Sequence, residues 1–177
     1  MRVLGLDLSL TSSGWSSAGR TGTLTTKEVG PARLFFLKTQ LRDLIFEYTP
    51  DLIVIENYSF ASKNSRAHAI GEWGGVARLL IWDMTYSYVE VPPTSRAKFA
   101  TGKGNASKGE VMSAVSARTG IVWSGKGAED QCDAWILEEM ALCQHGLPRH
   151  DWPAVNRSAL ESVDWTPISR YPQERNT

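Results

Sequence analysis

The sequence predicts an α/β fold in which a mixed sheet, three antiparallel strands followed by parallel strands, is flanked by helices. Short strand-like runs open the chain and end in turn clusters, a pattern typical of an antiparallel meander. Behind the first long helical pattern stands a continuous apolar run, "DLIVIEN", of the kind found in strands buried on both faces of a parallel sheet. Further helical patterns supply the layers that cover such a sheet.

The first three strands are predicted from residues 2–10, 15–19 and 21–29. The first of these runs ends in the turn cluster "TSSG", and the other two alternate like neighbouring strands of a meander. Residues 32–48 follow Pro31 and place apolar side chains at helical spacing, so we predict a helix that ends at "TP".

The second half of the chain is predicted to be mainly helical. Helical patterns cover residues 66–84, 108–120 and 130–144, and a strand, "YSYVEV", a short helix behind prolines and a glycine-rich stretch separate the first two. The end of the chain is rich in proline and polar residues with scattered tryptophans. We therefore predict a folded domain over residues 1–145 and a loosely packed or extended tail over residues 146–177.

The composition describes one globular domain. With 177 residues, of which 42% are hydrophobic and 21% charged, the chain can build a core, and its net charge of zero argues against indiscriminate coating of polyanions. Cys132 and Cys143 fall on one predicted helix, which excludes a disulfide between them and favours a reducing, cytoplasmic setting. There is no signal-peptide pattern and no apolar run of about eighteen residues, so we expect neither secretion nor a membrane span.

Two acids lie near the ends of predicted strands, Asp7 in the first strand and Glu56 after the crossover helix. Chemistry in open α/β sheets gathers at the carboxyl ends of parallel strands, and a desolvated carboxylate there needs a hydrogen bond, a basic partner or a cation. Asp7 either accepts backbone N–H groups in its turn or is a ligand. Glu56 either pairs with a loop residue such as Lys63 or is a ligand.

Two more acids, Asp130 and Asp133, share one face at the start of the last predicted helix. An acid in a first helical turn is favoured by capping and by the helix dipole, which accounts for Asp130 without any function. Asp133 precedes the apolar "AWIL" and has no such explanation. Four acids from three elements, with no basic residue close to them in sequence, predict a carboxylate cluster that binds Mg²⁺ or Mn²⁺ rather than zinc. Two such ions bridged by shared carboxylates suit attack of water on a phosphodiester.

The order of these motifs resembles the RuvC-type Holliday junction resolvases, which have an RNase H-like fold. The matching segments are "GLDLSLTSSGW", "IVIENYSF", "VPPTSRAKFATGKGNASKGEVM" and "EDQCDAWIL", which span roughly residues 1–143 in the order of the family. The resemblance implies an RNase H-like nuclease domain over residues 1–145, and the sequence departs from the bacterial pattern enough to suggest a bacteriophage branch.

The resemblance also implies the roles of the site residues. Asp7, Glu56, Asp130 and Asp133 are expected to bind two Mg²⁺ ions, for which Mn²⁺ can substitute, and Lys108, or else Lys98, to assist at the scissile phosphate. It further implies a homodimer that nicks opposed strands of a four-way DNA junction in the cytoplasm, the host cytoplasm if a bacteriophage encodes the chain.

Basic residues are segregated into two segments, residues 57–71 and 91–109, that lack acids. Both follow elements that end near the predicted acids, as is needed to lead phosphates to the metals. Tyr58 or Phe60 is expected to insert between bases at the junction, unless it packs under the loop. The predicted DNA-contacting residues are Tyr58, Phe60, Lys63, Arg66, Arg96, Lys98, Lys103 and Lys108.

The sequence also allows other functions and leaves two interpretations of one helix. An RNase H-like nuclease for flaps or RNA–DNA hybrids and a non-catalytic junction-binding protein remain alternatives. A phosphotransferase using ATP would need a second domain with its own phosphate loop, so no nucleotide cofactor is expected. The predicted helix over residues 66–84 is the dimer-contact candidate, through Trp73, Leu79 and Leu80, although it equally suits a core-facing helix.

Overall fold

A five-stranded mixed sheet in the order β3-β2-β1-β4-β5 forms the centre of the molecule. The computed structural model describes residues 1–57 and 67–171. β1 pairs antiparallel with β2 and parallel with β4, β2 pairs antiparallel with β3, and β4 pairs parallel with β5, which confirms the predicted mixed sheet. The strands are β1 Val3–Asp7, β2 Ser13–Ser17, β3 Arg20–Leu24, β4 Leu52–Glu56 and β5 Tyr88–Val91.

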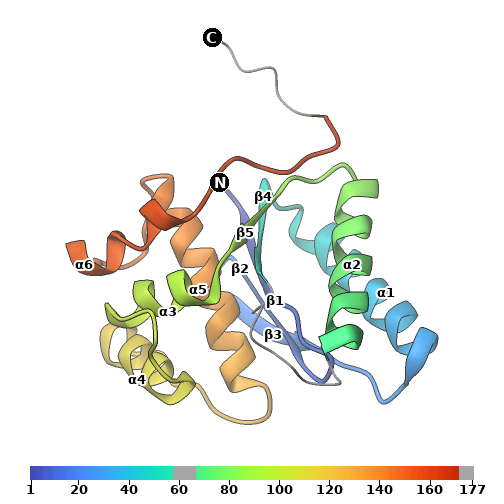
Figure 1. The fold of residues 1–177 in the computed structure, drawn as a ribbon, viewed down its shortest axis with the longest axis horizontal. Coiled ribbons are helices and arrows are strands. Elements are labelled where there is room, and N and C mark those ends of the chain that lie inside the picture. Colours follow the sequence, from blue (N-terminus) through green and yellow to red (C-terminus); the bar gives the residue numbers. More distant parts are fainter. Residues whose placement is uncertain (58–66, 172–177) are drawn as a thin grey trace.

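Helices cover both faces of the sheet, and each face has its own hydrophobic core (Figure 1). α1 and α2 pack on one face over Leu6 and Ile55. α3, α4 and α5 lie on the other face, where Val54 and Val91 belong to the core. The helices are α1 Gly30–Tyr48, α2 Ala67–Asp83, α3 Pro93–Thr101, α4 Lys108–Thr119, α5 Ala128–Gln144 and the short α6 Ala154–Arg157, which a 3₁₀ turn, Leu160–Ser162, follows.

Local sequence signals explain where several helices begin and end. A proline stands in the first turn of α1, where its missing N–H costs nothing. Ser107 caps α4 in a capping box with Glu110, which places Lys108 in the first turn of that helix. α3 ends at Gly102, whose φ of 82° is readily adopted only by glycine.

Two glycines allow α5 to lie directly against β1 and β2. A Cβ atom at Gly14 would stand 1.9 Å from the carbonyl oxygen of Asp130, and one at Gly5 would stand 2.2 Å from that of Ala134. Both separations are far below van der Waals contact, so only glycine fits at either position. The close approach brings the N-terminal half of α5 to the end of β1.

The C-terminal segment differs from its prediction as a loosely packed or extended tail. Trp152 is 2% exposed and packs against Phe99 with ring centroids 4.3 Å apart. Asn156 donates a hydrogen bond of 2.7 Å to the carbonyl oxygen of Phe99, and Ala159 is fully buried. The segment continues past β5, where Ile168 pairs with Tyr88. The composition concealed this packing because the buried residues are spaced among prolines and polar residues.

The candidate dimer contacts on α2 separate into two kinds. Trp73 is fully buried in its own core and donates a hydrogen bond of 2.9 Å to the hydroxyl of Ser13, and Leu80 is also buried. Neither is exposed to meet a second chain, which corrects that part of the prediction. Leu79 is 59% exposed and remains a candidate dimer contact.

Among the described helices, none combines the length and the apolar character that a membrane crossing requires.

Candidate active site

The alternation of side chains along two strands directs two acids toward α5. Leu4 and Leu6 of β1 point into the core beneath α1 and α2, so Asp7 points to the opposite face. On β4, Leu52 and Val54 face α5, and Glu56 follows them on the same side at the strand's carboxyl end. The parallel pairing of β1 with β4 places the two acids at one edge of the sheet.

Asp133 completes a cluster of three carboxylates. One oxygen of Asp7, one of Glu56 and one of Asp133 all lie within 4.8 Å of one another. Asp133 is 2% exposed and Asp7 8% exposed, so these groups are largely withdrawn from water. The Oδ2 atom of Asp133 is buried and has no hydrogen-bond partner among the described residues. A carboxylate oxygen left in that state is costly unless a ligand compensates it.

Arg96 lies within this cluster. It is 7% exposed, its Nε donates to Oε1 of Glu56 at 2.5 Å, and its Nη1 donates to Oδ1 of Asp133. The structure corrects the expectation that Arg96 contacts DNA, because the guanidinium is buried against two acids of the chain itself. Sequence reasoning missed the pairing because Arg96 belongs to a basic segment, and only the fold brings α3 over the end of β4.

The electrostatics of the cluster reflect burial first and mutual repulsion second. Burial raises the pKa of Asp7 well above its usual range, and Glu56 and Asp133 raise it further. Burial also raises the pKa of Asp133 to about 6, although Arg96 opposes that change. Burial would lower the pKa of Arg96, but the negative charges of Glu56 and Asp133 outweigh it and leave the pKa raised. Burial and mutual repulsion thus disfavour the charged forms of these acids, and Arg96 only partly offsets both effects.

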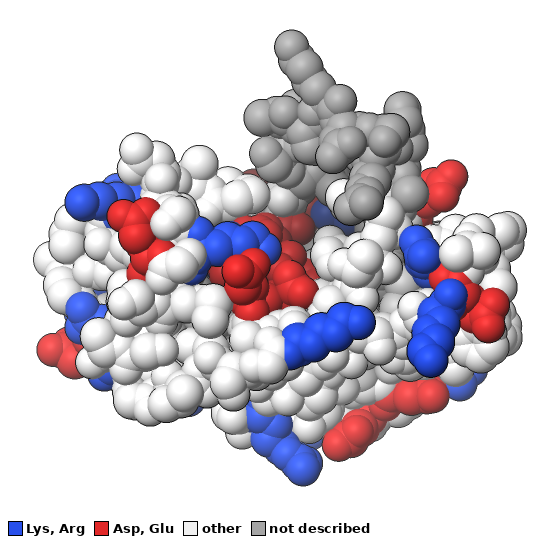
Figure 2. All heavy atoms as spheres, turned by 90° about the horizontal axis from the view of Figure 1, so that it is seen from below, with Lys and Arg blue, Asp and Glu red and all other residues white. Residues whose placement is uncertain are grey.

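Asp130 and Lys108 form the rim of the site. The Nζ of Lys108 is 3.8 Å from Oδ1 of Asp130 and 3.5 Å from Oε2 of Glu129. Asp130 lies outside the group of three that converge, and burial raises its pKa against the effect of Lys108. Figure 2 shows acidic side chains gathered in a recess at the face where β1 and β4 end, with basic side chains at its edge.

The donor set fits a hard divalent cation. Asp7, Glu56 and Asp133 offer only carboxylate oxygens, the ligands preferred by Mg²⁺, Mn²⁺ and Ca²⁺. The unpartnered Oδ2 of Asp133 supplies an observation independent of the donor count, since a cation would satisfy it. The acidic cluster therefore has both the chemistry and the open ligand atom that a metal site requires.

The remaining predicted DNA-contacting residues differ in their exposure and in their contacts with the acids. Lys103 is exposed just after α3, and Lys98 is half-buried on that helix, without an ion pair to any described acid. Lys108 is thus better placed than Lys98 to act at the acids. Four of the predicted residues lie outside the described residues: Tyr58, Phe60, Lys63 and Arg66.

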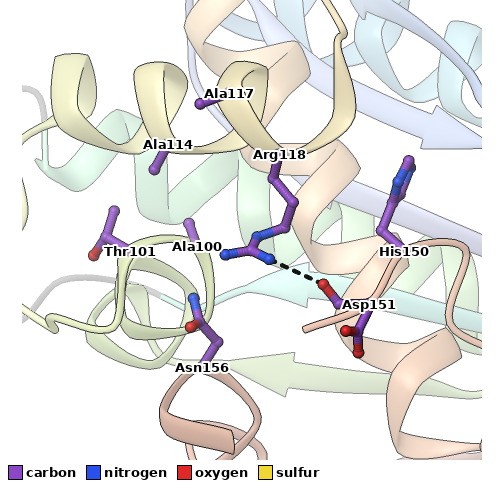
Figure 3. A pocket seen from close by; sticks show the side chains of 8 residues that line it. All are labelled: Ala100, Thr101, Ala114, Ala117, Arg118, His150, Asp151 and Asn156. Atoms are coloured by element: carbon purple, nitrogen blue, oxygen red, sulfur yellow. Dashed lines mark hydrogen bonds between the residues drawn. The ribbon is translucent and has the colours of Figure 1, made fainter. Parts of the chain in front are cut away.

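A cavity of 600 Å³ lies away from the acids, between α3, α4 and the C-terminal segment (Figure 3). Arg118 crosses it and donates a hydrogen bond of 3.0 Å to the carbonyl oxygen of Asp151. None of the clustered carboxylates lines this cavity. It is therefore separate from the recess that holds the acidic cluster.

The family model described as crossover junction endodeoxyribonuclease RuvC matches residues 3–136. The chain belongs to the RuvC family. A curated RuvC from Caldicellulosiruptor saccharolyticus is 29% identical over 156 residues, which cover 81% of this chain and 91% of the relative. The RuvC of Synechococcus sp. is 31% identical over 126 residues, covering 65% of this chain and 81% of the relative.

Solved structures show that the RuvC fold is retained. A Thermus thermophilus RuvC solved in complex with a Holliday junction substrate superposes with a TM-score of 0.70 at 17% identity, covering 95% of this chain and 99% of that one. The yeast mitochondrial Holliday junction resolvase Ydc2 gives a TM-score of 0.54 at 12% identity, covering 91% of this chain and 80% of the other. The RNase H-like architecture expected from the sequence is therefore confirmed.

Proposed function

We propose that this RuvC-family chain is a metal-dependent, structure-selective endonuclease that resolves four-way DNA junctions by paired hydrolysis of phosphodiesters. The observation that carries the proposal is the convergence of carboxylates from β1, β4 and α5 within 4.8 Å, with one buried oxygen that no described residue hydrogen-bonds. The T. thermophilus relative whose fold this chain shares was solved on a Holliday junction.

Asp7, Glu56 and Asp133 are the proposed metal ligands, with Asp130 joining them from the rim when a second ion binds. We propose two Mg²⁺ ions, with Mn²⁺ as a substitute. Divalent ions held there supply Lewis-acid stabilisation of the charge that develops on the phosphate during hydrolysis. The chain's own contribution is a preformed and largely buried set of oxygens, whose rigid mounting on two strands and one helix fixes where the phosphate must lie.

Lys108 is the proposed cation for the scissile phosphate. It projects from the first turn of α4 beside Asp130, and its half-exposed ammonium is accessible to an incoming strand. Its pKa is raised: burial lowers it, but nearby acids led by Asp133 outweigh that effect, so the charge persists at neutral pH. Lys98 and Lys103 extend the proposed phosphate path. Tyr58, Phe60, Lys63 and Arg66, which lie outside the described residues, remain proposed DNA contacts on the grounds of sequence.

A homodimer is proposed to carry two such sites to one junction. The supporting surface is an apolar groove of 230 Å³ between α1 and α2, lined in part by Leu34, Leu79 and Val76. Phe35 at this groove is 64% exposed, a large apolar area for a side chain in water. A self-complementary contact through this face would relate the two sites by a two-fold axis and so produce symmetric nicks.

The test is cleavage of a labelled, immobile four-way junction beside duplex, flap and RNA–DNA hybrid substrates, with Mg²⁺, Mn²⁺ or chelator. We expect paired, ligatable nicks on the junction that disappear with chelator and in Asp7→Asn. Preferential cutting of flap or hybrid would replace the proposed substrate while keeping the metals. Junction binding without any cutting would identify a non-catalytic junction-binding protein instead.

A further inference from the structure

The feature that the proposed function leaves unexplained is a buried arginine inside a metal-binding cluster. Arg96 comes from α3, whereas the acids that it contacts come from β4 and α5. A site that must attract divalent cations has no electrostatic need for a fixed positive charge, which repels them. The position of Arg96 therefore calls for a role of its own.

The guanidinium divides the carboxylate oxygens into two sets. Its donors engage Oε1 of Glu56 and Oδ1 of Asp133, one oxygen from each acid. Oδ2 of Asp133 has no hydrogen-bond partner in the described part of the chain, although Asp133 is only 2% exposed. Arg96 thus occupies one side of the cluster and leaves ligand atoms open on the other.

We propose that Arg96 is a built-in cation of the acidic site, which weakens divalent-metal binding to the free protein and so sets its metal affinity. The inference rests on the proposed function, because it takes Asp7, Glu56 and Asp133 as metal ligands. In this scheme Arg96 touches neither the DNA nor the reacting atoms. Its charge acts on the ion through the two acids that they share.

Elementary electrostatics gives the direction of the effect. Arg96 and a divalent ion compete for the negative charge of the same two carboxylates, and they repel one another across a largely buried cluster where water screens little. Removing the guanidinium charge therefore strengthens the attraction for the ion. If Arg96 only held the carboxylates in place, its removal would instead loosen the ligands and weaken binding.

Two substitutions separate charge from positioning. Arg96→Met removes the charge and keeps an unbranched side chain, whereas Arg96→Lys keeps the charge and loses the planar fork that bonds both acids. Arg78→Met is the matched control, because Arg78 also makes an ion pair of 2.5 Å, with Glu90, away from the acidic cluster. Arg96→Gln, which retains hydrogen-bond donors, replaces Arg96→Met if the latter does not fold.

The experiment is a titration of the full chain with Mn²⁺ at pH 8 without DNA, with free Mn²⁺ measured by electron paramagnetic resonance. We expect Arg96→Met to bind Mn²⁺ at least tenfold more tightly than the unaltered chain, and Arg96→Lys and Arg78→Met to bind within threefold of it. Thermal unfolding in chelator identifies which variants are folded.

The outcomes distinguish this inference from the function on which it rests. Equal or weaker Mn²⁺ binding by a folded Arg96→Met or Arg96→Gln chain, while the unaltered chain binds Mn²⁺, would overturn the role of Arg96 and leave the metal site standing. Absence of Mn²⁺ binding by the unaltered chain and all variants would overturn both.

Discussion

Helix α5 carries buried acids in both of its halves, and the acids of the two halves differ in their hydrogen bonding. Asp133 lies in the N-terminal half, and Glu138 and Glu139 lie one turn or more further on; all three are almost fully buried. An arginine contacts each set, Arg96 in the first case and Arg149 in the second. Burial, charge and the type of partner are therefore alike in the two regions.

Hydrogen bonding distinguishes the two regions. Both oxygens of Glu138 are bonded, one by Ser16 at 2.5 Å and one by Arg149 at 3.1 Å. Glu139 accepts three bonds on Oε1 and one on Oε2, from Arg149, His150 and Trp152. The glutamates are saturated by the protein, and they tie the segment after α5 to that helix.

Asp133, by contrast, has one oxygen without a hydrogen-bond partner within residues 1–57 and 67–171, and it lies beside Asp7 and Glu56. Burial alone therefore does not identify a functional acid in this chain. A buried acid whose oxygens are all bonded stabilises the fold, and one with an open oxygen beside other acids is available to a cation.

The largest expected effect is on catalysis by Asp133→Asn. Loss of a ligand oxygen should lower junction cleavage about 1000-fold or more, since metal-ion stabilisation of the transition state amounts to several kcal/mol. Stability in chelator should not fall, because the pKa of Asp133 is raised to about 6 and the charged carboxylate is disfavoured in the folded state. Gel-based cleavage rates and thermal unfolding measure the two quantities. A stable but fully active variant would remove Asp133 from the site.

Glu139→Gln should produce the opposite pattern. The substitution weakens bonds to the backbone of Arg149 and His150 and to the indole of Trp152, so the free energy of unfolding should drop by about 2–3 kcal/mol. Cleavage per folded molecule should stay close to that of the unaltered chain. Urea denaturation with parallel cleavage assays checks this. Unchanged stability would contradict the structural role assigned to the C-terminal half of α5.

Stabilisation by bound metal should differ between Asp133→Asn and Glu139→Gln. A ligand that binds only the folded state stabilises it by about 2.7 kcal/mol at a hundred times its dissociation constant. Mn²⁺ should therefore raise the melting temperature of the unaltered chain and of Glu139→Gln, but hardly that of Asp133→Asn. An equal upward shift in all three proteins would mean that Mn²⁺ binds elsewhere.

A smaller effect is expected at the rim. Lys108→Met should reduce cleavage about 10- to 100-fold. This loss is smaller than that expected on removal of a fully buried catalytic charge, because water partly screens the half-exposed ammonium. The Mn²⁺-induced rise in melting temperature should persist in this variant, since Lys108 does not bind the ion. A loss of metal binding together with cleavage would instead make Lys108 part of the structure of the metal site.

Much of the fold could be predicted from the sequence because its signals are local. The alternating opening strands, the apolar run of β4 and the helical spacing of α1 and α5 each depend on periodicity, and the structure contains all of them. The packed segment around Trp152 was missed. Its burial depends on the distant partner Phe99, which no periodic pattern indicates.

The convergence of the three acids could be predicted from the sequence, but the buried arginine that pairs with two of them could not. Asp7 and Glu56 stand at strand ends, and Asp133 precedes an apolar helix face, so topology alone brings them together. Arg96 looks like any other member of a basic segment until α3 is placed over β4. The hydrogen bonds to Glu139 likewise depend on a reversal of the chain after α5 that no sequence pattern predicts.

The most direct test of the acidic recess as the metal site is a crystal structure of the chain grown with Mn²⁺, with the ion located by its anomalous scattering. We expect a peak within ligand distance of Asp7, Glu56 and Asp133, including Oδ2 of Asp133, and none at Glu138 and Glu139. An ion at the glutamates, or none at the three clustered acids at saturating Mn²⁺, would contradict the assignment of the acidic recess as the metal site.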